Sequence, residues 1–302
     1  MIGVLYSVIL SEMNCGFHAH VSSESCKCNN GYIQRCSTHV DSDAPFGPVG
    51  SPTHCICIPS RVSAKLHARS ENAWHLPRPV SKRVWAPRRK FDPKVAQREG
   101  VWRASDGGLN EADRNILGKI FYESDSVFET GVGESTRIAV FTGVPRYTGV
   151  DNSIEWLETV SKVSPSHYRF HWADIGTIGS YSKPIDDLSA DKWPFSSTAA
   201  LSAESTGFDF YFVDGRFRVA NFAMAFLHAR ATGRLAHEFK VGIHDMEKRA
   251  STHYKACFKI GYPIEGFSVN ESSARLTIFR RREEVTDKTI FNIWKQHASD
   301  KR

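Results

Sequence analysis

Four acidic residues each follow an apolar run that has the length of a buried strand. They are Glu129, Asp151, Asp174 and Asp214. In an open parallel sheet the carboxyl ends of the strands meet at one edge, and such sheets bind their ligands there. We therefore expect the four carboxylates to converge on one ligand site.

The stretch between the first two acids, residues 127–151, reads VFETGVGESTRIAVFTGVPRYTGVD. Gly131 and Gly133 let the backbone turn through positive φ and approach a ligand closely. Ser135 and Thr136 can cap the next helix, whose amide groups would face the site. Asp151 then ends a second strand, where it can accept ribose hydroxyls. The layout predicts a nucleotide-binding βαβ unit, and a simple tight turn at the two glycines is the alternative.

A dinucleotide fingerprint would need a third glycine where Thr136 stands, so a site that grips a pyrophosphate is disfavoured. The pattern that remains, an E-x-G-x-G loop with an acid at the end of the second strand, resembles motif I of class I S-adenosylmethionine-dependent methyltransferases. The resemblance spans roughly residues 105–280. It implies S-adenosylmethionine as the cofactor, held by Glu129, Gly131, Gly133, Glu134, Ser135, Asp151 and Asp174.

Within this resemblance Asp174 would contact the adenine amino group of the cofactor. A turn that Asp174 begins together with Gly176 is the alternative. In the resembled family the acid after the fourth strand, here Asp214, faces the methyl group and the substrate.

Methyl transfer needs alignment and deprotonation of the acceptor. The catalytic candidates are Asp214, Arg216, His244 and Asp245, which follow two successive predicted strands. His244 can act as a general base, because its ordinary pKa is near neutral. It can equally serve as a hydrogen-bonding group at the end of its strand. Arg216 and Arg218 would favour an anionic substrate if they face the pocket.

Asp214 and Asp245 are also oxygen ligands of the kind that divalent cations prefer. Metal-dependent O-methyltransferases carry a third oxygen ligand directly after the second acid, and Met246 occupies that place here. We therefore expect no metal.

The fold class follows from the alternation of strand and helix patterns, which predicts an α/β protein. The resemblance implies a doubly wound, mostly parallel seven-stranded sheet with helices on both faces, closed by an antiparallel hairpin. A helix with apolar residues from Ile116 to Phe121, capped by Ser105 or Asn110, would precede the first strand. A second helix is expected over residues 246–258.

Residues 176–206 form a long stretch rich in Ser, Asp, Pro and Gly. Connections of such length are often functional. We expect this one to cover the sheet edge as a substrate lid that includes Tyr181 and Trp193.

The chain divides by composition into a cysteine-rich segment (1–58), a basic linker with prolines and tryptophans (59–101), a methyltransferase-like domain (102–282) and a helical tail (283–302). The hydrophobic content of 41% and net charge of +6 are those of a globular protein. No aromatic platform or base-reading motif accompanies the basic linker, so nucleic acid is not an expected partner.

Six of the seven cysteines fall in the first sixty residues. Such a cluster predicts a disulfide framework, and the run CKCNNGYIQRC resembles part of an epidermal-growth-factor-like (EGF-like) module. A zinc site that uses nearby histidines, or free thiols, are the alternatives. Disulfides, together with the glycosylation acceptor Asn270-Glu271-Ser272, predict the secretory pathway or an extracellular location. Reduced cysteines would predict the cytoplasm.

Residues 1–10 are apolar and too short to span a bilayer. They are either the remnant of a signal or anchor, or a buried strand. No other stretch approaches the length of a membrane span.

The leading hypothesis is a methyltransferase that transfers the methyl group to an oxygen of a small molecule or glycan. One alternative is a protein that keeps the fold without catalysis. Another is an extracellular interaction protein whose cysteine module recognises a partner.

Overall fold

The computed structural model describes residues 20–22, 25–27, 32–37, 54–59, 87–102, 108–247, 249–264 and 273–301. The chain divides into two compact units, residues 1–73 and 74–302. In the first unit, β1 (His20–Ser22) pairs with β2 (Ser25–Lys27), and β3 (Tyr32–Ser37) pairs with β4 (His54–Pro59), both antiparallel. The predicted disulfides, zinc site, EGF-like module and glycosylation acceptor concern side chains or segments outside the described part of the chain.

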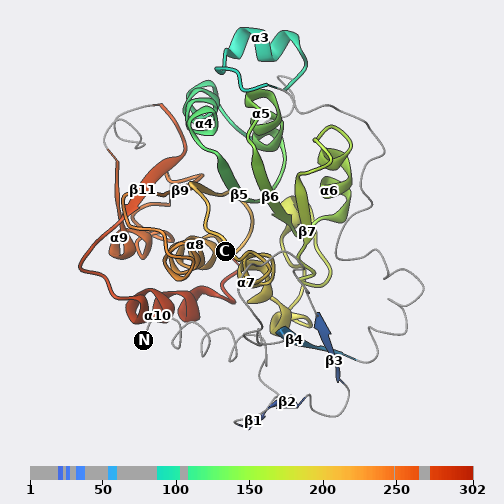
Figure 1. Cartoon of the computed structure of the whole chain (residues 1–302). Helices are drawn as coiled ribbons and strands as arrows, with labels where there is room; N and C mark the ends of the chain where they lie inside the picture. The colour runs from blue at the N-terminus through green and yellow to red at the C-terminus, as the bar shows by residue number, and fades with distance from the viewer. Residues whose placement is uncertain are drawn as a thin grey trace, which may run out of the picture. The chain divides into compact units, whose positions relative to one another are not determined.

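The second unit is built on one seven-stranded sheet with the order β10-β11-β9-β8-β5-β6-β7 (Figure 1). The five neighbouring strands from β9 to the edge strand β7 are parallel, and β11 runs antiparallel to both of its neighbours. The strands are β5 (Ser126–Thr130), β6 (Arg146–Asp151), β7 (Arg169–Trp172), β8 (Phe210–Val213), β9 (Lys240–Ile243), β10 (Gly261–Pro263) and β11 (Thr277–Arg281). The predicted fold class is confirmed.

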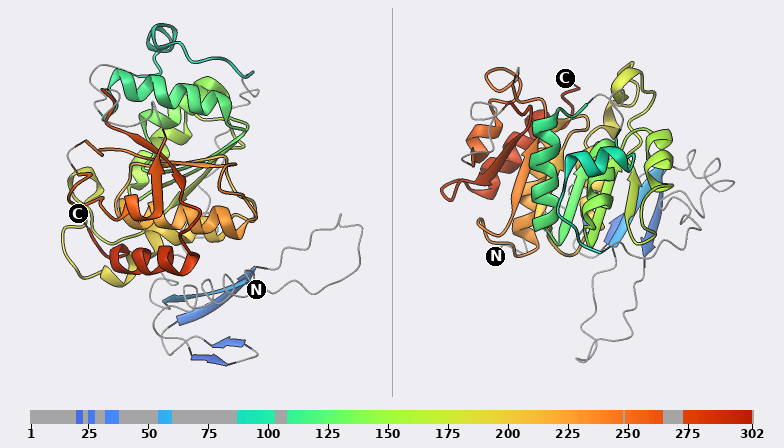
Figure 2. Two further views of the ribbon diagram at one scale, coloured as in Figure 1. Left: turned by 90° about the vertical axis from the view of Figure 1, so that its left-hand side faces the viewer. Right: turned by 90° about the horizontal axis from the view of Figure 1, so that it is seen from above.

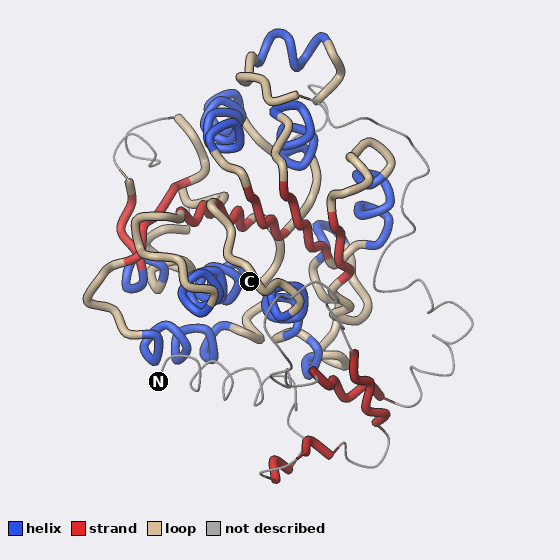
Figure 3. The backbone as a smooth tube through the Cα atoms, in the orientation of Figure 1, coloured by secondary structure: helices blue, strands red, loops and turns tan. Residues whose placement is uncertain are grey.

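Helices cover both faces of the sheet (Figures 2 and 3). On one face lie α4 (Glu111–Glu123), α5 (Glu134–Thr142) and α6 (Ile154–Ser161), and on the other lie α7 (Phe195–Ser202), α8 (Arg218–Ala231) and α10 (Asp287–His297). The short helices α3 (Pro93–Arg98) and α9 (Cys257–Ile260) flank these layers. None of the described helices combines the length and apolarity needed to cross a membrane.

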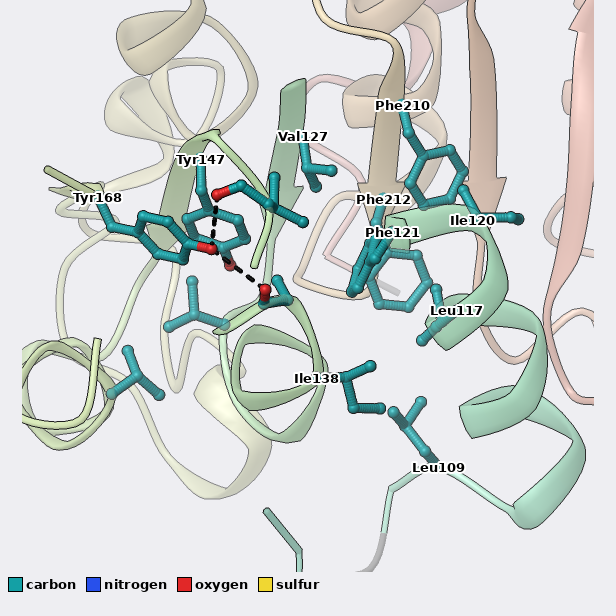
Figure 4. Packing of buried hydrophobic residues seen from close by; sticks show 14 of the residues in the cluster. Leu109, Leu117, Ile120, Phe121, Val127, Ile138, Tyr147, Tyr168, Phe210 and Phe212 are labelled. Carbon is teal, nitrogen blue, oxygen red and sulfur yellow. Dashed lines mark hydrogen bonds between the residues drawn. The ribbon is translucent and has the colours of Figure 1, made fainter. Parts of the chain in front are cut away.

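An apolar core between the sheet and the helices α4 and α5 holds these elements together. All residues of β5 and β8 are buried, as expected for strands with helices on both faces. Leu117 and Phe121 on α4 pack toward β8, where the rings of Phe121 and Phe210 meet at 5.9 Å (Figure 4). The apolar face of α4 is therefore fixed over the centre of the sheet.

One sequence expectation fails in the second half of the unit. Residues 247 and 249–256 form turns instead of a helix, and only the last residues of the expected helix belong to α9. Tertiary contacts override the local pattern here, because the Tyr254 hydroxyl accepts hydrogen bonds from Arg218 and Arg249. In the expected lid, Tyr181 is 90% exposed, but Trp193 is buried and its indole donates to the carbonyl of Ile175.

The loop after β5 packs directly against the loop after β8. Gly131 has a φ of 83°, and a Cβ there would lie 2.4 Å from the amide nitrogen of Gly215 and 2.6 Å from the carbonyl carbon of Asp214. Both the conformation and the close approach therefore require glycine.

We predict that Gly131→Ala lowers the free energy of unfolding by about 1–3 kcal/mol, since it combines a strained φ with a backbone clash. Gly108→Ala is the control, because a Cβ at that exposed position meets no atom within 4 Å. Urea unfolding of both variants measures the difference. Equal stability of Gly131→Ala and the wild type would show that the two loops are not packed in this way.

Candidate functional site

Glu129 is fully buried within β5 and faces its own loop. Its carboxyl group accepts hydrogen bonds from the hydroxyls of Ser135, Thr136 and Tyr147. Burial raises its pKa to about 8, although the hydrogen bonds from Ser135 and Tyr147 oppose this rise. The group therefore largely retains its proton at neutral pH and fastens the loop between β5 and α5. Ser135, predicted to bind the cofactor, instead donates its hydroxyl to Glu129 and so helps to fasten this loop.

Asp151 closes β6 and joins two loops at the sheet edge. Its Oδ2 accepts from the amide of Val132 at 3.0 Å, and its Oδ1 accepts from the amide of Ser153 at 2.8 Å. The residue is 8% exposed, and burial raises its pKa to about 6. Each oxygen retains a second lone pair, so Asp151 can still accept a hydrogen bond from a ligand hydroxyl.

Two further predicted cofactor residues lie beside this edge. Asp174 accepts from the amide of Gly176 at 2.9 Å and pairs with Lys192 at 2.7 Å, so it forms the turn that the sequence left open as an alternative. Glu134, in the first turn of α5, forms an ion pair with Arg114 of α4 through Oε1. Its Oε2 is buried without a hydrogen-bond partner.

His244, directly after β9, lies between two carboxylates. Its Nδ1 is 3.1 Å from Asp214 Oδ1, and its Nε2 is 3.1 Å from Asp113 Oδ2. Burial alone would lower the pKa of His244, but Asp214 and Asp113 outweigh it and raise the pKa to about 10. The ring is therefore an imidazolium that donates at both nitrogens. In this state it holds the two acids and has no lone pair with which to act as a general base.

Asp113 is a site residue that the sequence analysis missed. It is fully buried near the start of α4, where it forms a capping box with Asn110. Its Oδ1 also accepts from the amides of Arg275 and Leu276, at 2.7 and 3.1 Å. The capping box has a visible sequence signature, N-x-x-D. The contact with His244, 131 positions away, has no such signature.

Arg218, in the first turn of α8, connects Asp214 and Asp245. Its Nη2 donates to Asp214 Oδ1 at 2.9 Å, and its Nη1 donates to Asp245 Oδ2 at 2.6 Å. Its other bonds go to the Tyr254 hydroxyl and to the carbonyls of Asp214 and Gly215. All five donors of the guanidinium group are therefore in use.

Asp245 has a φ of 57° and also pairs with Arg275. Burial would raise the pKa of this carboxyl, but Arg218 outweighs it and the pKa falls to about 2. Asp245 is thus a permanent anion that Arg218 ties to Asp214.

The ligand atoms of Asp214, His244 and Asp245 all lie within 4.8 Å of one another, a spacing that a metal ion could use. However, the Arg218 guanidinium already binds both carboxylates. A cation would have to displace Arg218. The residues present therefore do not fit a metal, and the site has an internal cation in that place.

Arg216, the last of the catalytic candidates, is half-buried in the loop after β8. No hydrogen bond or ion pair joins its guanidinium group to any described residue. A small cavity lies nearby, lined by Phe217, Arg218, Val219, His253, Tyr254, His297 and Asp300. Neither Gly131 nor Asp151 lines that cavity.

No protein-family model matches this chain, and no curated protein matches it. Among solved structures, a methyltransferase-like protein from Silicibacter pomeroyi DSS-3 superposes with a TM-score of 0.50 and 23% identity, over 62% of this chain and 94% of that chain. An SAH-bound methyltransferase from Podospora anserina gives a TM-score of 0.35 and 10% identity, over 66% of this chain and 100% of that chain. The first likeness shows that the second unit has a methyltransferase-like fold.

We predict that Glu129→Gln changes how stability depends on pH. The native state holds the Glu129 proton more tightly than the unfolded chain, whose ordinary pKa is 4.5. The stabilisation from this group is full below about pH 4.5 and is lost as the pH rises through about 8. The wild type should therefore lose up to about 1.4 kcal/mol per pH unit relative to the variant across this window.

Urea unfolding at a series of pH values measures this difference. Glu123→Gln is the control, because Glu123 is exposed at the end of α4. A constant difference between wild type and Glu129→Gln from pH 5 to 8 would contradict the inward, protonated position of Glu129.

We also predict that Asp113→Asn lowers the free energy of unfolding by about 3–5 kcal/mol, because it leaves a buried imidazolium with one carboxylate fewer. The pKa of His244, followed by NMR, should fall in the same variant. Glu111→Gln, exposed on the same helix, should stay within about 0.5 kcal/mol of the wild type. An unchanged pKa of His244 in Asp113→Asn would contradict the contact between Asp113 and His244.

Proposed function

We propose that the second unit is an S-adenosylmethionine-dependent methyltransferase. The observation that supports this most is the reversal of strand order between β8 and β5, the place where open α/β sheets bind ligands. The Gly131 loop and Asp214 follow strands that end at this edge, and Asp151 is the last residue of a third such strand. The fold shared with the methyltransferase-like protein from Silicibacter pomeroyi agrees with the proposal.

The residues at this edge fit the cofactor in two respects. The backbone at Gly133 borders open space, since a Cβ there would meet no atom within 4 Å. Glu134 Oε2 is a buried acceptor without a partner, suited to the ammonium group of the methionine moiety. Asp151 would bind the ribose hydroxyls, and Asp174 would bind the adenine amino group once it releases Lys192 or Gly176.

When bound, the cofactor supplies an electrophilic methyl carbon on its sulfonium. The protein then needs to align an acceptor and remove its proton. Asp214 is the candidate for this role, because Oδ1 binds Arg218 and His244 while no described residue binds Oδ2. His244 and Arg218 act as positioning residues that hold the Asp214 carboxylate in one orientation.

The acceptor is proposed to be a hydroxyl group of a small molecule or glycan. A secretory setting rests on the cysteine-rich segment, whose side chains lie outside the described residues. A divergent protein without catalysis is the second candidate. It is favoured by the hydrogen bonds from Val132 and Ser153 that already engage Asp151.

Calorimetric titration with S-adenosylhomocysteine tests the cofactor site. We expect micromolar affinity, about −8 kcal/mol, for the wild type. Asp151→Ala should weaken it at least tenfold, since a hydrogen bond to a charged group contributes about 1.5–3 kcal/mol. Asp187→Ala, exposed in the loop before α7, should bind like the wild type.

Absence of binding to the wild type, with no thermal stabilisation by the ligand, would favour the non-catalytic candidate. Circular dichroism of Asp151→Ala establishes that the variant is folded before its affinity is compared.

A further inference from the structure

The two arginines that follow β8, Arg216 in its loop and Arg218 in the first turn of α8, differ in their hydrogen bonding. Arg218 uses all five of its donors on described residues. Arg216, two positions earlier, uses none on any described residue. Of the pair that the sequence linked to an anionic substrate, Arg218 is therefore occupied and Arg216 is available.

Two other arginines, Arg218 and Arg249, lie near Arg216 and add positive charge to its surroundings. Arg249 lies next to Arg218, because both donate to the Tyr254 hydroxyl, at 2.9 and 3.0 Å. Asp245 already pairs with Arg218 and Arg275 and has Arg249 at 3.8 Å. Burial, with the nearby charges of Arg218 and Arg249, lowers the pKa of Arg216, and Tyr254 and Asp214 oppose this only in part. A half-buried guanidinium among like charges is costly unless an anion accompanies it.

The backbone around Arg216 is held in place. Its carbonyl accepts a hydrogen bond from Asn221 Nδ2 at 2.7 Å. The next residue, Phe217, is buried and has a φ of 53°, a conformation that costs about 1–3 kcal/mol in a residue other than glycine. Strain of this kind persists where surrounding contacts enforce it, as at binding sites. The loop thus fixes Arg216 close to Asp214.

We propose that Arg216 binds an oxyanion of the methyl acceptor, so that the acceptor carries a carboxylate, sulfate or phosphate group near its reacting hydroxyl. This inference rests on the proposed function. A planar guanidinium group binds such oxyanions through two parallel hydrogen bonds. Arg249, whose side chain is 37% exposed, is a second cation whose charge acts on Arg216. Acidic sugars and other hydroxylated anions fit this description, whereas neutral acceptors would leave Arg216 unpaired.

The experiment titrates the full chain with sodium sulfate, sodium phosphate or sodium acetate, with sodium chloride keeping the ionic strength constant. Binding is followed by calorimetry. We expect at least one of the three oxyanions to bind the wild type, and Arg216→Gln to weaken that binding at least tenfold. Arg216→Lys keeps the charge without the bidentate geometry and should fall between them. The oxyanion that binds best indicates which group the acceptor carries.

Arg98→Gln is the matched control, because it removes the same charge from an exposed position on α3. It should bind each anion within twofold of the wild type. Oxyanion binding that is equal in Arg216→Gln and the wild type overturns the proposal, as does the absence of oxyanion binding to the wild type. Thermal melting of each variant verifies that it is folded, and Arg216→Lys serves if Arg216→Gln is not.

Titration of the same proteins with S-adenosylhomocysteine separates this inference from the proposed function. Arg216→Gln should bind S-adenosylhomocysteine within twofold of the wild type. Cofactor binding without Arg216-dependent oxyanion binding defeats the acceptor inference alone. Arg216-dependent oxyanion binding without cofactor binding defeats the proposed methyltransferase and upholds the anion site.

Discussion

The site depends on one buried charge, the imidazolium of His244 between Asp113 and Asp214. Removing such a group from water is costly, and it is tolerated here because a carboxylate accepts from each ring nitrogen. The three residues come from the start of α4 and the ends of β8 and β9. Because the imidazolium must meet both partners, the three ends are held in one relative position, and Asp113 extends the link to Arg275 and Leu276 before β11.

Arg218 adds a second link at the same edge. Its guanidinium group holds two carboxylates together, as a metal ion does in a metal-binding site. It holds Asp214 and Asp245 together, with oxygen to nitrogen distances of 2.9 and 2.6 Å. Unlike a metal, it leaves no open coordination position for a substrate oxygen. In the proposed methyltransferase, this cluster would contribute alignment and a fixed electrostatic environment, which are the main requirements of methyl transfer.

Local patterns of the sequence predicted the parallel strands and the acids that end them, whereas the seven-stranded sheet was implied by the resemblance to methyltransferases. The sequence was insufficient for what those residues contact. Glu129 turns inward to Ser135 and Tyr147, which follows from how the loop closes. The contact between Asp113 and His244 joins distant segments and leaves no periodic pattern. The helix expected over residues 246–258 failed because contacts of Tyr254 with two arginines outweigh local propensity.

Different loops along the sheet edge are proposed to bind the cofactor and the methyl acceptor. The elements assigned to the cofactor are the loops after β5 and β6, joined by Asp151 through the amides of Val132 and Ser153. The elements assigned to the acceptor are the loop after β8 and the turns after β9, joined by Arg218 and Tyr254. The two halves touch at Gly131 and Gly215, where backbone packs on backbone without side chains. Since no side chain of Arg216 or Arg249 takes part in that contact, the proposed anion preference of one half could change while the geometry of the proposed cofactor half is retained.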